Sequence, residues 1–108
     1  MMQVKDVSTE QRFSDQKMQK VGLFETPRAV CDVYCFEPGQ SQRIHVHHGM
    51  DKIYYVLEGE GTFYVGSEEQ TVGKGNAVFA PSETEHGVVN ENACRLTCLV
   101  FMAPSPNS

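Results

Sequence analysis

Residues 39–61 read GQSQRIHVHHGMDKIYYVLEGEG, and residues 75–90 read GNAVFAPSETEHGVVN. Both stretches place short apolar runs between glycine- or proline-containing turns, a pattern typical of β-strands joined by tight turns. His45 and His47 are two residues apart, so on a strand their side chains project to the same side. His86 opens a later apolar run, after Pro81. Two distant parts of the chain therefore carry histidines on predicted strands.

The same pattern extends outward from these stretches over most of the chain. It predicts strands at residues 29–36, 43–47, 52–57, 62–65, 70–72, 77–80, 86–90 and 94–102. Eight short strands with little helix favour an all-β fold, a jelly roll or another closed β-barrel. At 108 residues the chain has room for one core.

The chain ends are expected to lie outside this barrel. The first 26 residues are polar, and Ser14 with Asp15 is predicted to cap a short helical turn through Lys17 and Met18. The last residues are rich in proline, serine and asparagine. We therefore expect an N-terminal arm at 1–28, a barrel at 29–102 and a flexible tail at 103–108.

Cysteines lie on the first and the last predicted strands. If these strands are antiparallel neighbours, one register places Cys31 opposite Cys98 and Cys35 opposite Cys94. In a reducing cytoplasm such pairs are expected to stay thiols in the core. The alternation then directs Cys31, Val33 and Cys35 inward. The opposite face is half apolar, which indicates either a contact with a second copy or cover by the N-terminal arm.

The spacing of the glycines and histidines resembles the two motifs of the cupin superfamily. The first motif is matched by Gly39, His45, His47 and Gly59. The second is matched by Gly75, Pro81, His86 and Asn90. The resemblance covers roughly residues 29–102. It implies a jelly-roll barrel (a double-stranded β-helix) that is commonly dimeric and holds one divalent metal.

His45, His47 and His86 are the candidate ligands of that metal. Neutral imidazole is the commonest transition-metal ligand, and three nitrogens leave coordination positions open. Iron, manganese, zinc and nickel all suit such a set. His48 directly follows His47, so we expect it to point to the other side of the strand and to take no part.

Two positions depart from the family's motifs. The second motif usually has glycine where this chain has Glu83, and the first usually has a carboxylate ligand where it has Lys52. A charged ammonium about 4 Å from a divalent ion would be repelled by roughly 8 kcal/mol at an effective dielectric constant of about 20. Three outcomes follow: Lys52 becomes neutral at the rim of a three-histidine site, it turns away so that Asp51 approaches the metal, or no metal binds and an anionic ligand takes its place.

Two further side chains are candidates for contact with a small molecule. Arg43 lies two residues before His45, on the predicted inner face, where it would bind a carboxylate or else lie exposed at a strand end. Tyr54 shares the predicted face of Lys52 and is expected to line the cavity. Lys52 itself is the candidate catalytic acid or base.

Composition narrows the function classes. The chain has 9 Lys and Arg against 14 Asp and Glu, a formal net charge of −5, and its basic residues are scattered, so we expect neither nucleic acid nor an anionic membrane as a partner. With no apolar leader or spanning segment, a cytoplasmic setting is expected. The favoured function is a metalloenzyme of dioxygenase or isomerase type acting on a small polar or anionic molecule. The alternatives are a non-catalytic ligand-binding or metal-sensing module and a structural dimer, and a homodimer is the expected assembly.

Overall fold

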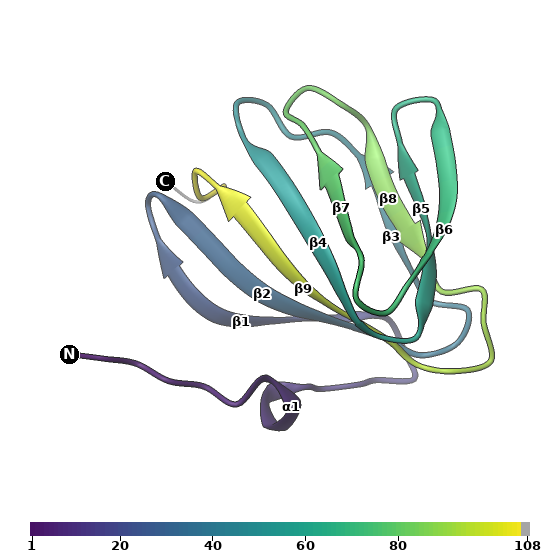
Figure 1. The fold of residues 1–108 in the computed structure, drawn as a ribbon, viewed down its shortest axis with the longest axis horizontal. Coiled ribbons are helices and arrows are strands. Elements are labelled where there is room, and N and C mark those ends of the chain that lie inside the picture. Colours follow the sequence, from purple (N-terminus) through teal and green to yellow (C-terminus); the bar gives the residue numbers. More distant parts are fainter. Residues whose placement is uncertain (107–108) are drawn as a thin grey trace.

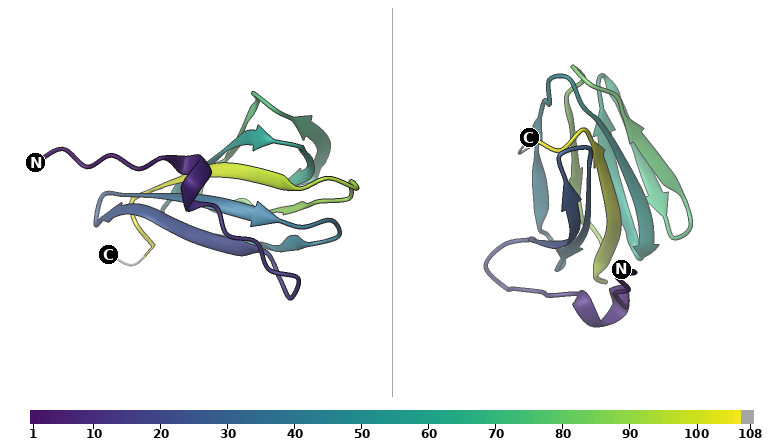
Figure 2. Two further views of the ribbon diagram at one scale, coloured as in Figure 1. Left: turned by 90° about the horizontal axis from the view of Figure 1, so that it is seen from below. Right: turned by 90° about the vertical axis from the view of Figure 1, so that its left-hand side faces the viewer.

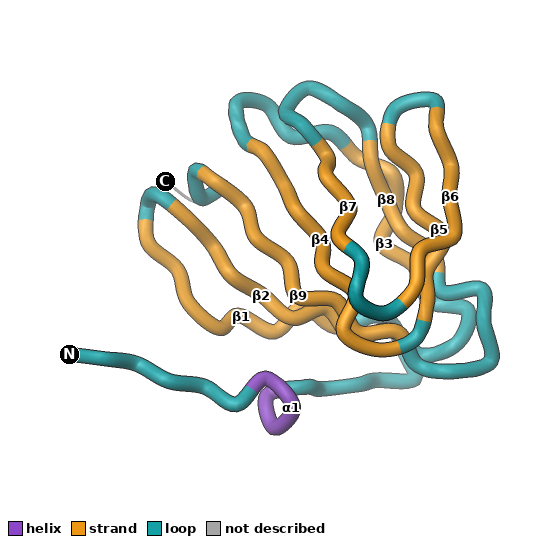
Figure 3. The backbone as a smooth tube through the Cα atoms, in the orientation of Figure 1, coloured by secondary structure: helices purple, strands orange, loops and turns teal. Residues whose placement is uncertain are grey.

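The computed structural model describes residues 1–106, which form two facing β-sheets and one short helix (Figures 1 and 3). The elements are α1 (Val7–Glu10), β1 (Gln19–Thr26), β2 (Ala29–Phe36), β3 (Ser41–His45), β4 (Asp51–Glu58), β5 (Glu60–Val65), β6 (Glu68–Gly73), β7 (Ala77–Ala80), β8 (His86–Val89) and β9 (Leu96–Ala103). None of the helices in this part of the chain has the length and apolar character needed to cross a membrane.

Neighbours in each sheet are antiparallel. One sheet has the order β1-β2-β9-β4-β7 and the other has the order β3-β8-β5-β6. From β2 onward the chain passes back and forth between the sheets, with only β5 and β6 as consecutive strands of one sheet. As a result β4, β7 and β9 lie in one layer while β3, β5, β6 and β8 lie in the other (Figure 1). The predicted all-β jelly roll, the double-stranded β-helix, is confirmed.

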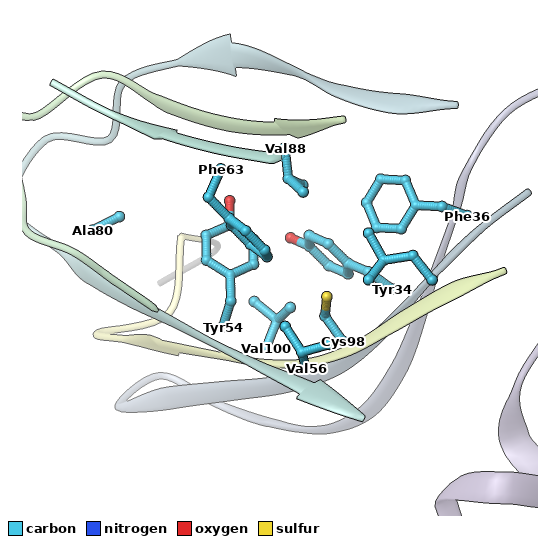
Figure 4. Packing of buried hydrophobic residues seen from close by; sticks show 10 residues of the cluster. Tyr34, Phe36, Tyr54, Val56, Phe63, Ala80, Val88, Cys98 and Val100 are labelled. Atoms are coloured by element: carbon cyan, nitrogen blue, oxygen red, sulfur yellow. The ribbon is translucent and has the colours of Figure 1, made fainter. Parts of the chain in front are cut away.

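The main core lies between the two sheets. Figure 4 shows Tyr34 and Tyr54 from the five-stranded sheet facing Phe63 and Val88 from the four-stranded sheet. All four side chains are at most 2% exposed. Tyr54 packs edge-on against Phe63, with ring centroids 5.2 Å apart. Burial of these large rings supplies much of the force that holds the sheets together.

The N-terminal arm differs from its prediction in two ways. Its residues 19–26 form β1, an edge strand paired with β2 except at an irregularity between Gly22 and Phe24. Its helix lies at 7–10 rather than after Ser14, because the Asp6 carboxylate accepts from the Ser8 amide at 3.0 Å and caps α1 there. Figure 2 shows the segment before β1 passing across the outside of the five-stranded sheet. Residues 107–108, the end of the predicted tail, lie outside the described residues.

The predicted orientation of β2 is wrong. Tyr34 and Phe36 point into the main core, whereas Val33 and Cys35 face outward into a second cluster. Val7 and Phe13 of the arm cover that cluster. Both faces of β2 are therefore buried, and an apolar pattern on both faces does not reveal which one is inward.

The predicted cysteine register is also wrong, although β2 and β9 are antiparallel neighbours as expected. Cys98 lies opposite Tyr34, and Cys31 lies opposite Phe101. Cys94 is exposed in the loop before β9, so it pairs with no residue of β2. The four cysteines are free thiols, of which Cys35 and Cys98 are buried.

The turn between β4 and β5 requires glycine for two reasons. Gly59 has a φ of +78°, and a Cβ there would collide with the backbone carbonyl of Arg95. We expect Gly59→Ala to destabilise the fold by about 3–5 kcal/mol, since backbone strain and overpacking act together. Urea unfolding measures this change.

Gly39 provides the matched control. Its φ is +85°, but a Cβ added there would meet no atom within 4 Å, so Gly39→Ala carries the strain alone. It should cost only about 1–2 kcal/mol. Equal losses in the two variants would show that the Arg95 contact is unimportant.

Candidate metal centre

Strand pairing places two of the predicted histidines opposite each other. His45 is the last residue of β3 and His86 is the first residue of β8, and they are partners in the antiparallel register. His47 follows β3 by two residues. The structure therefore brings together all three histidines, although the paired two come from distant parts of the sequence.

The three imidazoles form a compact cluster. One ligand atom from each of His45, His47 and His86 lies within 4.8 Å of the others, and the ring centroids are 4.4–5.3 Å apart. Nε2 of His45 lies 3.0 Å from Nε2 of His47. Two nitrogens bound to one metal at about 2.1 Å and at right angles lie about 3.0 Å apart, so this pair has a suitable spacing.

Hydrogen bonds select which ring nitrogen is available. Nδ1 of His45 donates to the Arg43 carbonyl at 2.7 Å, and Nδ1 of His86 donates to the Thr84 carbonyl at 2.9 Å. Their Nε2 atoms are therefore unprotonated, and each has a lone pair that can bind a metal. Nε2 of His86 is buried and has no hydrogen-bond partner among residues 1–106. Such an orphaned acceptor beside two other imidazoles fits a metal ligand.

The surroundings keep the rings uncharged. Burial lowers the pKa of His45 and of His86, and burial together with the neighbouring His45 lowers the pKa of His47 to about 4. All three are therefore neutral near pH 7, the state in which imidazole binds metals. The residues present fit one divalent transition metal.

Lys52 lies inside the fold beside this cluster. It is 1% exposed. Burial, and to a lesser degree the positive charge of the nearby Lys20, lowers its pKa to about 7. Its Nζ has no hydrogen-bond partner in the described chain, and it lies 4.9 Å from the Tyr34 ring centroid and 5.0 Å from that of Tyr54. Asp51 does not replace it, because its carboxylate is exposed and accepts from the Ser82 amide at 3.0 Å.

A bulge changes which residues of β3 face inward. The pairing with β8 is irregular between Gln42 and His45, so Gln42 is buried while Arg43 is exposed. Strict alternation predicted the reverse for Arg43. Arg43 nevertheless lines a cavity together with Gln42 and His45. Tyr54 is fully buried on the expected face, and its hydroxyl donates to Gln42 at 2.6 Å.

Glu83 braces the loop after β3, a role that the sequence did not predict. Its amide donates to the His47 carbonyl, and its carboxylate accepts from the Gly49 amide, both at 2.8 Å. The same carboxylate lies 2.6 Å from Nδ1 of His48, whose exposed ring is not part of the cluster. Glu83 has a φ of 67°, in the left-handed region that favours glycine. The sequence carried one signal of this backbone conformation, because the family's motif usually has glycine at this position.

Fold and site together define a small double-stranded β-helix with a histidine cluster between its sheets. A model of the cupin domain matches residues 32–101, and the chain belongs to this family.

Relatives agree with this assignment. The crystal structure of TT1209 from Thermus thermophilus is 45% identical, covers 97% of this chain and 100% of its own, and superposes with a TM-score of 0.94. An uncharacterized protein with a double-stranded β-helix domain from Klebsiella pneumoniae shares the fold at 22% identity, with coverages of 100% and 95% and a TM-score of 0.91. A Thermotoga maritima protein named oxalate-binding protein is 36% identical over 53 residues, 49% of this chain and 44% of its own. The chain spans less than half the length of the curated relatives it matches.

Two variants of Glu83 separate its backbone strain from its side-chain bonds. Glu83→Ala loses the contacts to Gly49 and His48 but keeps the positive φ, whereas Glu83→Gly loses the same contacts and relieves the strain. We expect Glu83→Ala to have the lower urea midpoint of the two. If the glycine variant is equally unstable, strain at this position is not significant.

The buried Lys52 amine predicts a pH dependence of stability in metal-free protein. Its folded pKa of about 7 is below the ordinary value of 10.5, so between these values the unfolded chain binds more protons than the folded chain. Stability should therefore rise with pH above 7, by up to about 1.4 kcal/mol per pH unit. The comparison is unfolding of wild type and Lys52→Met from pH 7 to 8.5, below the ordinary pKa of cysteine.

Lys52→Met has no titrating group at this position and serves as the reference. The difference in unfolding free energy, wild type minus Lys52→Met, should increase across that range. A difference that stays constant would mean that Lys52 remains charged in the folded protein.

Proposed function

We propose that this cupin holds one divalent transition metal on His45, His47 and His86 and is a metalloenzyme of dioxygenase or isomerase type acting on a small polar or anionic molecule. The main support is the buried, unpartnered Nε2 of His86 next to two neutral imidazoles. Iron, manganese, zinc and nickel are the candidate metals. Such a metal supplies a Lewis acid with open coordination positions, and iron also supplies oxygen chemistry.

The protein's own groups supply proton transfer and binding. Lys52 is a candidate acid or base, because an amine with a pKa of about 7 can hold or release a proton at neutral pH. Arg43 lies on the cavity wall, where its guanidinium can bind an acidic group of the substrate. Tyr54 acts on the substrate through Gln42, which it holds at the cavity by its hydroxyl.

A non-catalytic ligand-binding or metal-sensing role is the second candidate. The Thermotoga maritima relative is named for binding oxalate rather than for converting it. The same histidine cluster and cavity serve either role, and measured turnover of a substrate distinguishes them.

A homodimer and a cytoplasmic setting stay predictions. One row of side chains supports the homodimer: strands β1, β9, β4 and β7 of the five-stranded sheet carry exposed Phe24, Phe101, Ile53 and Phe79, with the partly buried Cys31 of β2 between the first two. The arm covers the adjacent Val33 and Leu99 and places the Lys5 amine 5.4 Å from the Phe24 ring centroid. Phe101, Ile53 and Phe79 stay 41–56% exposed. An uncovered apolar row of this kind is typical of contacts between proteins.

Metal analysis of protein made without a histidine tag tests the proposed centre. We expect about one equivalent of transition metal in wild type and a loss of at least tenfold in affinity in His45→Gln and His86→Gln, because each removes a ligand nitrogen. Elemental analysis and competition with a chelator measure both quantities.

His48→Gln is the matched control for these variants. Its ring is exposed and bonded to Glu83, so metal retention should stay near that of wild type. Circular dichroism shows that each variant is folded. Folded wild type without affinity for any of the four metals would contradict the proposal, and so would equal loss in all three variants.

A further inference from the structure

A cavity of about 630 Å³ opens between β1 and β3, the edge strands of the two sheets. Its walls include Lys17 and Lys20 on one side and Arg43 and His45 on the other. His45 also belongs to the histidine cluster, so the cavity reaches the candidate metal centre. Cavities of this size accommodate ligands larger than two or three heavy atoms.

The cavity is positively charged in an otherwise acidic protein. Three of the chain's nine Lys and Arg residues line it, and no carboxylate is among the lining residues that the structure describes. Asp32 on β2 is half-buried, and its carboxylate interacts electrostatically with Lys20 and Lys52 and with a second acidic group, Glu25. Lys17, Lys20, Arg43 and Lys52 outnumber Asp32 and Glu25, so an excess of cations remains.

A second observation inside the fold also indicates an acidic ligand. Nζ of Lys20 and Nζ of Lys52 lie 5.4 Å and 4.9 Å from the centroid of the same Tyr34 ring. The Lys52 amine is buried without a hydrogen-bond partner among the residues described. An unpartnered buried donor is costly, and an anion from solvent would satisfy it.

The ligand set strengthens the same conclusion. Three neutral imidazoles leave the full charge on a divalent metal, and Lys52 stands where the family's motif usually has a carboxylate. The centre therefore has a charge that a single carboxylate only partly neutralises, while the outer wall carries further cations.

We propose that the cavity binds a small molecule with two separate acidic groups, one at the candidate metal centre and the other at Lys17, Lys20 and Arg43. This inference rests on the proposed function, because it assigns the first acidic group to that centre. The cations of the outer wall then select diacids over monoacids, because only the second acidic group of a diacid contacts them.

Calorimetric titration with acetate, oxalate and glutarate tests the assignment, using protein loaded with zinc at pH 7.5 and moderate salt. Acetate has one acidic group, oxalate has two adjacent groups and glutarate has two separated groups. We expect glutarate to bind at least tenfold more tightly than acetate. The double variant Lys20→Gln, Arg43→Gln should weaken glutarate at least tenfold and acetate less than twofold.

Lys74→Gln is the matched control, because it removes one positive charge from an exposed ion pair with Glu58 on another part of the surface. It should leave the affinity for glutarate within twofold of wild type. Circular dichroism of each variant shows whether it is folded.

The outcomes separate the two proposals. Zinc can bind normally while acetate and glutarate bind with equal affinity, or while the double variant weakens both acids equally. Either result overturns the two-acid inference and leaves the metal centre intact. Tighter binding of oxalate than of glutarate also overturns it. If the protein binds none of the four candidate metals but still binds glutarate through Lys20 and Arg43, the proposed function is contradicted and the cationic wall is supported as an acid-binding site.

Discussion

The antiparallel pairing of β3 with β8 determines the rest of the site. It joins two segments that are far apart in the sequence and places His45 opposite His86 in one register. The irregularity in this ladder between Gln42 and His45 turns Gln42 inward and leaves Arg43 at the cavity. Because side chains alternate along a strand, a slip of one residue in either strand would separate the two rings.

The burial of Lys52 has a cost in stability. Burying an amine without a hydrogen-bond partner is unfavourable, and the rings of Tyr34 and Tyr54 offset only part of that cost through their negative faces. The result is an amine that changes its protonation near neutral pH next to three neutral imidazoles. Residues that are unfavourable for the fold yet buried at a cluster of ligands are typical of functional sites.

The short strands and glycine turns are local properties of the sequence and predicted a β-barrel. The meeting of the three histidines was implied by the resemblance to the cupin motifs, because strand alternation alone places only His45 and His47 on one side. The sequence pattern did not predict β1, whose polar residues suit an edge strand, or the inward face of β2, which is covered on both sides. Lys20 lines the cavity because it lies on β1. Without a predicted strand there, nothing in the sequence placed Lys20 at the site. Glu83 was noted as a departure, but its bonds to the loop after β3 depend on tertiary contacts.

Both walls of the cavity are edge strands, and this position affects how easily the cavity opens locally. Among the described strands, β1 has a backbone ladder only with β2, and β3 only with β8. Segments tethered along one side open locally at lower free energy than strands in the middle of a sheet. Local opening at these edges would change the width of the cavity mouth and leave the packed rings of Tyr54 and Phe63 in place.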